Sequence, residues 1–221
     1  MDTTTAHGGH AAFFRAKLGS LLAIAPLGIW AVFHVWNNLS IFKSGAEWQQ
    51  DVTGHQHPVA LAITTIVVLA PLLLHTLWGL ARLRTSRPNN VRYGYFENLK
   101  YLLQRLSAVG VMLFLGAHVW EAFLHPRLIE HQAERFEDIA GAMHGEPATL
   151  IVYLLGTLGV AYHLGNGLSG FAMSWGLATS RRALRGFEAA GIVLFVVFLA
   201  MSWAAIYGLW TVGAAYPVPV D

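Results

Sequence analysis

Five long apolar runs, separated by polar and charged connections, constrain this chain more than any other feature. They cover about residues 18–42, 59–83, 105–124, 148–177 and 187–212. At about 1.5 Å per helical residue, each run can cross a hydrocarbon core of about 30 Å. With 55% hydrophobic and only 12% charged residues, the chain is also more apolar and less charged than a typical soluble domain of this length. The sequence therefore predicts an all-α, polytopic membrane protein, in which residues 1–221 form a single domain with a bundle of five transmembrane helices.

Basic residues gather on one side of this predicted bundle. The connection between the second and third runs, residues 84–104, is the most basic in the chain, and Arg181, Arg182 and Arg185 fill the connection between the fourth and fifth. The connections on the opposite side carry both charge signs. Because positively charged loops tend to stay on the cytoplasmic side, we expect the orientation to be N-in/C-out.

The chain contains no cysteine. This excludes disulfides, cysteine-ligated iron–sulfur clusters and the Cys-x-x-Cys-His attachment of c-type haem. Any haem bound by this chain must therefore be held by histidine.

Each of the first four apolar runs contains one histidine: His34, His75, His118 and His163. Measured along the helix, His34 and His118 lie about 26 and 20 Å from the inner ends of their runs, in the outer half of the membrane. By the same rise, His75 and His163 lie about 26 and 24 Å from the outer ends, in the inner half. The four histidines thus form two pairs, each matched in depth.

The residues around these histidines support the pairing. The string His-Val-Trp occurs at residues 34–36 and again at 118–120, while His75 and His163 have small or helix-distorting residues one turn away. Those neighbours are Pro71, Gly79, Gly159 and Gly167. A groove beside an imidazole suits a flat ligand such as a porphyrin, and two imidazoles on one iron leave no axial site for oxygen. The pattern indicates electron transfer through two haems.

Two other interpretations of the histidines stay open. Four unrelated histidines could form hydrogen bonds between helices, and so could Asn37, Asn38, Thr76 and Asn166, the candidates for orienting the imidazoles. A metal or solute transporter with a histidine-lined path would need carboxylates or thiols beside the histidines. Glu121 is the one carboxylate expected inside the membrane.

Several strings carry a resemblance to a known family. They are residues 17–28 leading to His34 and Asn38, residues 97–105, His118, the string His-Leu-Gly-Asn-Gly at 163–167, and Trp175-Gly176. In this order and spacing, the chain resembles the single-polypeptide, dihaem cytochrome b membrane anchors of succinate:quinone oxidoreductases, including quinol:fumarate reductases. The resemblance covers all five predicted helices.

The resemblance implies two b haems, an outer one held by His34 and His118 and an inner one held by His75 and His163. It implies a flavoprotein (FAD) subunit that carries the dicarboxylate active site, an iron–sulfur subunit, lipid and a quinone as partners, with no nucleic acid. It places the protein in a bacterial inner (cytoplasmic) membrane. Its basic side would dock the partners and neutralise haem propionates, and solvated positive-inside charge explains the same residues equally well. The propionate candidates are Arg15, Lys17, Arg105, Arg181 and Arg182.

A quinone site needs a titratable or hydrogen-bonding group at the membrane edge. Glu121 and His57 are candidates on the outer side, and Gln104 and Ser107 on the inner side. Dihaem members of the family are often linked to menaquinone near the outer haem, which favours the outer side. Two alternatives to the whole assignment are a cytochrome b anchor of a hydrogenase or formate dehydrogenase, and a haem-free metal or solute transporter.

Overall fold

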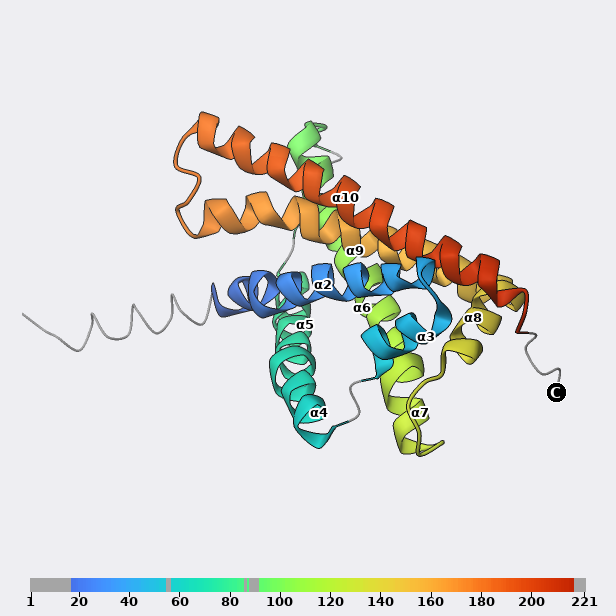
Figure 1. The fold of residues 1–221 in the computed structure, drawn as a ribbon. Coiled ribbons are helices and arrows are strands. Elements are labelled where there is room, and N and C mark those ends of the chain that lie inside the picture. The colour runs from blue at the N-terminus through green and yellow to red at the C-terminus, as the bar shows by residue number, and fades with distance from the viewer. Residues whose placement is uncertain (1–16, 55–56, 86, 88–91, 217–221) are drawn as a thin grey trace, which may run out of the picture.

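The computed structural model describes residues 17–54, 57–85, 87 and 92–216, and within these ranges it is all helical (Figure 1). Five spans in it are long and apolar enough to cross a membrane, which confirms the predicted fold class. In chain order they are the first span Lys17–Phe42, the second Pro58–Leu83, the third Phe96–Leu128, the fourth Pro147–Ser174 and the fifth Arg181–Gly213.

The first three spans are each made of several helical segments. The first contains η1 (Ala23–Gly28), α2 (Ile29–Asn38) and η2 (Leu39–Phe42). The second contains α4 (Pro58–Thr64), η4 (Thr65–Leu69) and α5 (Ala70–Leu83), and the third contains α6 (Phe96–Val119), η5 (Trp120–Leu124) and α7 (His125–Leu128). The fourth and fifth spans are the single helices α9 and α10. Between the spans lie α3 (Gly45–Trp48), η3 (Gln49–Thr53) and α8 (Phe136–Gly145).

The helix ends differ from the ends of the apolar runs, because capping and ion pairs set them rather than hydropathy. α6 begins at Phe96 rather than at 105, and α10 begins at Arg181 rather than at 187. The Lys100 ammonium in the first turns of α6 lies 2.7 Å from the Glu188 carboxylate of α10, so these polar turns support each other. The Ser180 hydroxyl accepts a hydrogen bond from the Ala183 amide and caps α10.

α9 ends at Ser174, three residues before the predicted boundary. Gly176 has φ of +72°, a left-handed conformation in which glycine pays no steric penalty. The amides of Gly176 and Leu177 donate to the carbonyls of Met173 and Ala172. These two bonds form a Schellman motif, which satisfies the last carbonyls of the helix.

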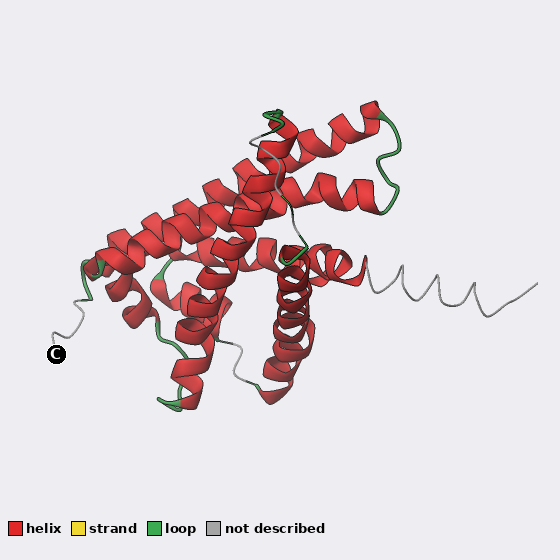
Figure 2. Ribbon diagram, turned by 180° about the vertical axis from the view of Figure 1, so that it is seen from behind, coloured by secondary structure: helices red, strands yellow, loops and turns green. Residues whose placement is uncertain are grey.

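α9 and α10 pack side by side along most of their lengths (Figures 1 and 2). Their backbones come closest at Gly165 and Gly191, where a Cβ added to either residue would collide with the carbonyl oxygen of the other. Small residues at such a crossing let two membrane helices gain van der Waals contact. This pair forms the most closely packed side of the bundle.

A Gly191→Ala variant is expected to lose about 1–3 kcal/mol of stability, because the added methyl group must push two backbones apart. The matched control is Gly186→Ala on the same helix, where an added Cβ meets nothing within 4 Å. Thermal unfolding in detergent, followed by circular dichroism, measures the difference. Two variants that both melt at the wild-type temperature would contradict the close crossing.

One end of the bundle is closed by a small apolar core, which we call the cap end. Its buried residues are Ile41, Trp48, Phe136, Ala140, Met143, Ile206 and Leu209. The Gln49 side chain joins η3 to the segment before α8, since its Nε2 donates to the Glu134 carbonyl at 3.0 Å and its Oε1 accepts from the Phe136 amide at 2.6 Å. The cap end therefore holds the connections between spans one and two and between spans three and four in place.

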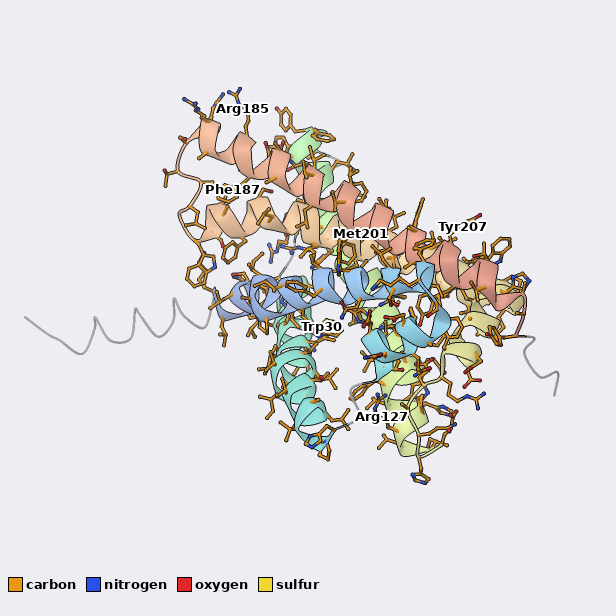
Figure 3. All side chains as sticks on the ribbon, viewed as in Figure 1. Trp30, Arg127, Arg185, Phe187, Met201 and Tyr207 are labelled. Carbon is orange, nitrogen blue, oxygen red and sulfur yellow. The ribbon has the colours of Figure 1, made fainter. Side chains whose placement is uncertain are left out.

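The opposite end, which we call the basic end, holds the start of the first and fifth spans and the connection between the second and third. Lys17, Arg82, Lys100 and Arg181 lie there. Figure 3 labels Arg185 near this end of α10 and Tyr207 toward the cap end. The structure thus keeps the asymmetry of charge that the sequence predicts along the bundle.

The second span stands apart from α9 and α10 and contacts the rest mainly through η1 and α6 (Figure 1). Val68 is the one buried residue in this span. α6 likewise crosses the bundle with only Phe114 buried. Residues of the second span and of α6 line a cavity, and α6 also packs against α9.

Candidate cofactor-binding site

A cavity of about 1770 Å³ lies between the spans and is lined by residues of all five. All four predicted histidines line it, together with Gly28, Gly79 and Gly167. Sites for a single small molecule usually have about 300–1,000 Å³, so this cavity has room for more than one ligand. Protein interiors are normally close-packed, and a void this large between apolar helices calls for a bulky apolar occupant.

The structure brings the histidines together in the two pairs that their depths predict. The ring centroids of His34 and His118 are 6.0 Å apart, and those of His75 and His163 are 6.4 Å apart. Two imidazoles on opposite sides of one metal ion, with metal–nitrogen bonds of about 2 Å, have centroids about 6 Å apart. Both pairs therefore fit axial ligation of one iron each. No group of three or more metal-ligating side chains occurs among the described residues.

Three of the four imidazoles have their Nδ1 atom engaged by the protein. Nδ1 of His75 lies 2.8 Å from the Gly19 carbonyl oxygen, and Nδ1 of His118 lies 3.0 Å from the Tyr153 hydroxyl. Nδ1 of His163 lies 3.3 Å from the Ser107 hydroxyl, which itself donates to the Gln104 carbonyl. Where Nδ1 carries the proton and donates it to one of these oxygens, Nε2 keeps its lone pair for a metal. This arrangement is typical of histidines that serve as ligands.

His34 is oriented by an aromatic side chain instead. Its ring stacks on Trp30 with a centroid distance of 4.6 Å and an interplanar angle of 10°. Figure 3 labels Trp30 on the first span, next to α5. On the partner helix, Phe114 stacks on His118 at 5.7 Å and 19°. Each of the two imidazoles therefore has one aromatic ring stacked on it, which restricts its rotation.

Two of the residues predicted as orienting groups, Asn38 and Asn166, bond to the His34 backbone and to Gln104 rather than to an imidazole ring. Asn38 donates from Nδ2 to the His34 carbonyl at 2.8 Å and accepts from Trp48 Nε1 at 3.1 Å, which joins the first span to the cap end. Asn166 Nδ2 donates to Gln104 Oε1 at 2.7 Å, and Gln104 Nε2 lies 3.1 Å from Nδ1 of His163. Asn37 instead reaches the Asp51 carbonyl, and Thr76 lines the cavity.

Several residues that contact the imidazoles were not predicted as orienting groups, among them Gly19, Trp30, Phe114 and Tyr153. Gly19 contributes only a carbonyl, which carries no signal in a sequence. Tyr153 and His118 are 35 positions apart, so only the packing of two helices brings them together. Gln104 and Ser107, predicted as inner quinone candidates, contact His163.

Basic side chains line the cavity at the basic end. Of the predicted propionate candidates, Lys17, Arg105 and Arg181 line it, Arg182 is not among the lining residues, and Arg15 lies outside the described residues. The Arg105 guanidinium lies 4.6 Å from the Tyr101 ring, and its buried Nε has no hydrogen-bond partner in the described part of the chain. A buried N–H without a partner fits an anionic group of a bound ligand.

The two outer quinone candidates do not line the cavity. Neither Glu121 nor His57 is among the described residues that line it. His57 serves as the N-cap of α4, where its Nδ1 accepts from the Val59 amide at 3.3 Å. The polar residues that do line the cap end include Asp51, Arg127 and Glu134.

No protein-family model matches the chain, and no solved structure matches it significantly. A search of curated proteins found a significant match to the succinate dehydrogenase cytochrome b558 subunit of Bacillus subtilis (strain 168). The two sequences are 27% identical over 208 residues, which cover 91% of this chain and 98% of that subunit. The chain is thus similar, over nearly the whole length of both proteins, to the cytochrome b subunit of a succinate dehydrogenase.

Proposed function

We propose that this chain is the membrane-anchor cytochrome b subunit of a succinate:quinone oxidoreductase, carrying electrons between an iron–sulfur subunit and a membrane quinone. The observation that carries the proposal is the cavity with two facing pairs of histidines, at centroid distances of 6.0 and 6.4 Å. The similarity to a succinate dehydrogenase cytochrome b558 subunit supports the choice of complex.

In this proposal His34 and His118 hold one b haem, and His75 and His163 hold the other. When bound, the haems would supply one-electron redox chemistry. The protein orients the ligating rings through Gly19, Tyr153 and Ser107, and its apolar walls keep water away from them. Lys17, Arg105 and Arg181 line the cavity and would suit the propionates of the inner haem.

The proposal includes an orientation, with the basic end facing the cytoplasm of a bacterial cell and the cap end facing outward. Positive charge at the basic end supports it. A flavoprotein subunit with FAD and an iron–sulfur subunit would dock on the basic end, and the dicarboxylate reaction would take place on the flavoprotein. The pair formed by His75 and His163 is nearer the basic end and would receive electrons first.

Substrate-driven reduction of the haems tests the choice of complex. A tagged chain, purified in mild detergent from the cells that make it, is expected to bring down a flavin-containing subunit and an iron–sulfur subunit. Adding succinate should reduce the b-type haem, whereas hydrogen or formate should not. Reduction by hydrogen or formate would favour an anchor of another oxidoreductase, and a colourless preparation would favour a transporter.

A Tyr153→Phe variant is expected to keep both haems and to raise the midpoint potential of the outer one by about 40 mV. The hydroxyl lies 3.0 Å from Nδ1 of His118, and a hydroxyl that accepts a hydrogen bond from Nδ1–H makes the imidazole a stronger donor to ferric iron. A hydrogen bond worth about 1 kcal/mol corresponds to about 40 mV for one electron.

Redox titration of the visible spectrum measures both potentials in this variant. Tyr207→Phe, on an exposed face of α10, is the control and should leave both unchanged. If the potential of the inner haem moved in Tyr153→Phe and that of the outer haem did not, the assignment of His118 to the outer haem would be wrong.

A further inference from the structure

The fifth span contains no histidine, yet it packs against the helix that carries His163. The Phe195 ring of α10 lies edge-to-face on the Tyr162 ring of α9 at a centroid distance of 6.5 Å. The two backbones cross closely at Gly165 and Gly191. These contacts on α9 are one residue before and two residues after the histidine. The position of α10 therefore fixes the turn of α9 that presents this imidazole.

α6 holds the same histidine through Gln104. Nε2 of Gln104 donates to the His163 carbonyl at 3.1 Å and lies 3.1 Å from Nδ1 of the ring, while Oε1 accepts from Asn166 Nδ2 at 2.7 Å. A Cβ added to Gly167 would lie 3.4 Å from Nε2 of Gln104, so the amide fits closely against α9. Whether Gln104 reaches His163 therefore depends on the depth and rotation of α6 relative to α9.

One turn before Gln104, an ion pair joins α6 to α10. The Lys100 ammonium lies 2.7 Å from Oε1 of Glu188 in α10 and 2.9 Å from Oε2 of Glu97 in α6 itself. Figure 3 labels Phe187, the residue before Glu188. The Lys100 and Glu188 side chains are 22% and 29% exposed, whereas that of Glu97 is 72% exposed. Residues four apart share one face of a helix, so Lys100 can set the position of Gln104.

The two ion pairs of Lys100 differ in what they hold. The pair with Glu97 lies within one helix, where water screens it and where it contributes little to stability. The pair with Glu188 joins two helices and is largely withdrawn from water, so removing one partner leaves the other charge partly buried. Loss of Glu188 should therefore loosen α6 from α10, whereas loss of Glu97 should not.

We propose that Lys100 and Glu188 are positioning residues for the inner haem. Their ion pair and the crossing of Gly165 with Gly191 form a brace, through which the fifth span holds His163 in its ligating position. This inference rests on the proposed function. It gives the fifth span, which offers no ligand, a part in binding the cofactor.

The brace should affect one haem and not the other. Lys100 and His118 both lie on α6, and the 18 positions between them correspond to about 27 Å along the helix. His118 is instead held by the Tyr153 hydroxyl and by stacking on Phe114. The outer haem, held by His34 and His118 in the proposed function, should therefore not respond to changes in the brace.

The test compares Glu188→Gln with Glu97→Gln, two variants that each remove one negative charge beside Lys100. Electron paramagnetic resonance (EPR) spectra of the oxidised, purified complex report the angle between the two histidine rings on each ferric haem. That angle is 71° between His75 and His163 and 61° in the outer pair. Transfer of haem to apomyoglobin gives the rate at which each variant loses its cofactor.

Glu188→Gln should shift the EPR signal of the inner haem and leave that of the outer haem unchanged. The inner haem should also leave this variant about 10-fold faster than the wild type, because its ligand is held less firmly. Glu97→Gln should match the wild type in both measurements. Exchanging the charges, with Lys100→Glu and Glu188→Lys in one chain, should restore both, since the ion pair forms again with its partners reversed.

Wild-type EPR signals in Glu188→Gln would overturn the proposal, and equal effects of Glu188→Gln and Glu97→Gln would also overturn it, because they would show an effect of charge alone. If Glu188→Gln does not accumulate, Glu188→Asp replaces it, since its shorter side chain keeps the charge and moves the carboxylate away from Lys100. An unshifted inner signal there would again overturn the proposal. A wild-type complex that contains no haem would instead overturn the proposed function itself.

Discussion

Replacing His34 with alanine should leave one b haem per chain instead of two. The His34 ring faces His118 at a centroid distance of 6.0 Å, so the substitution removes one of two axial ligands and leaves the pair at His75 and His163 intact. His118→Ala should have the same effect. A pyridine haemochrome assay on each purified variant gives the haem content, and a reduced-minus-oxidised spectrum shows which band is lost.

His57→Ala is the control for this pair of variants, because His57 caps α4 and is not among the described residues that line the cavity. It should keep both haems. If His34→Ala and His118→Ala removed different spectral bands, the two histidines would not share one iron, and the pairing by depth would be wrong.

His75→Ala should remove the other haem and loosen the second span. That span has Val68 as its one buried residue and turns its inner face to the cavity, so the bound haem would supply much of its contact with the bundle. The expected effect is large because both a cofactor and a helix contact are lost.

The absence of cysteine from the sequence makes this loosening measurable by thiol labelling. Cysteine is introduced at Val68, which is 5% exposed, or at Ile66, which is 69% exposed, and the detergent-solubilised protein is treated with a maleimide. The cysteine at 68 should be protected in the protein with all four histidines and labelled in the His75→Ala background. The cysteine at 66 should be labelled in both. Equal protection at 68 in both backgrounds would show that the span packs without haem.

The five helices and the pairing of the histidines could be predicted because both follow from position along a chain that must cross a layer of fixed thickness. Hydropathy places each span, and a constant rise per residue places each histidine in depth. The predicted helix ends were less accurate, because hydropathy does not report the contacts that set them. These contacts are the ion pair of Lys100 with Glu188, the Ser180 cap of α10 and the left-handed Gly176 after α9.

The residues around the histidines were harder to predict, because they depend on how the spans pack sideways. Depth alone cannot show that Tyr153 faces His118 or that Trp30 stacks on His34. The residues that line the cavity at the cap end are difficult to predict for the same reason. Glu121 and His57 were predicted from their place at the membrane edge, whereas the polar residues that line the cavity at the cap end include Arg127 and Glu134. Glu134 lies in a connection that Gln49 holds against η3.

The most direct test of the proposed function is the number of haems bound by the wild-type chain. The purified complex is assayed as its pyridine haemochrome, and its visible spectrum is recorded reduced and oxidised, with and without carbon monoxide. Two b haems per chain are expected, with a spectrum that carbon monoxide does not change, because two histidines would fill the axial positions of each iron. A chain without haem, or one whose haem binds carbon monoxide, would contradict it.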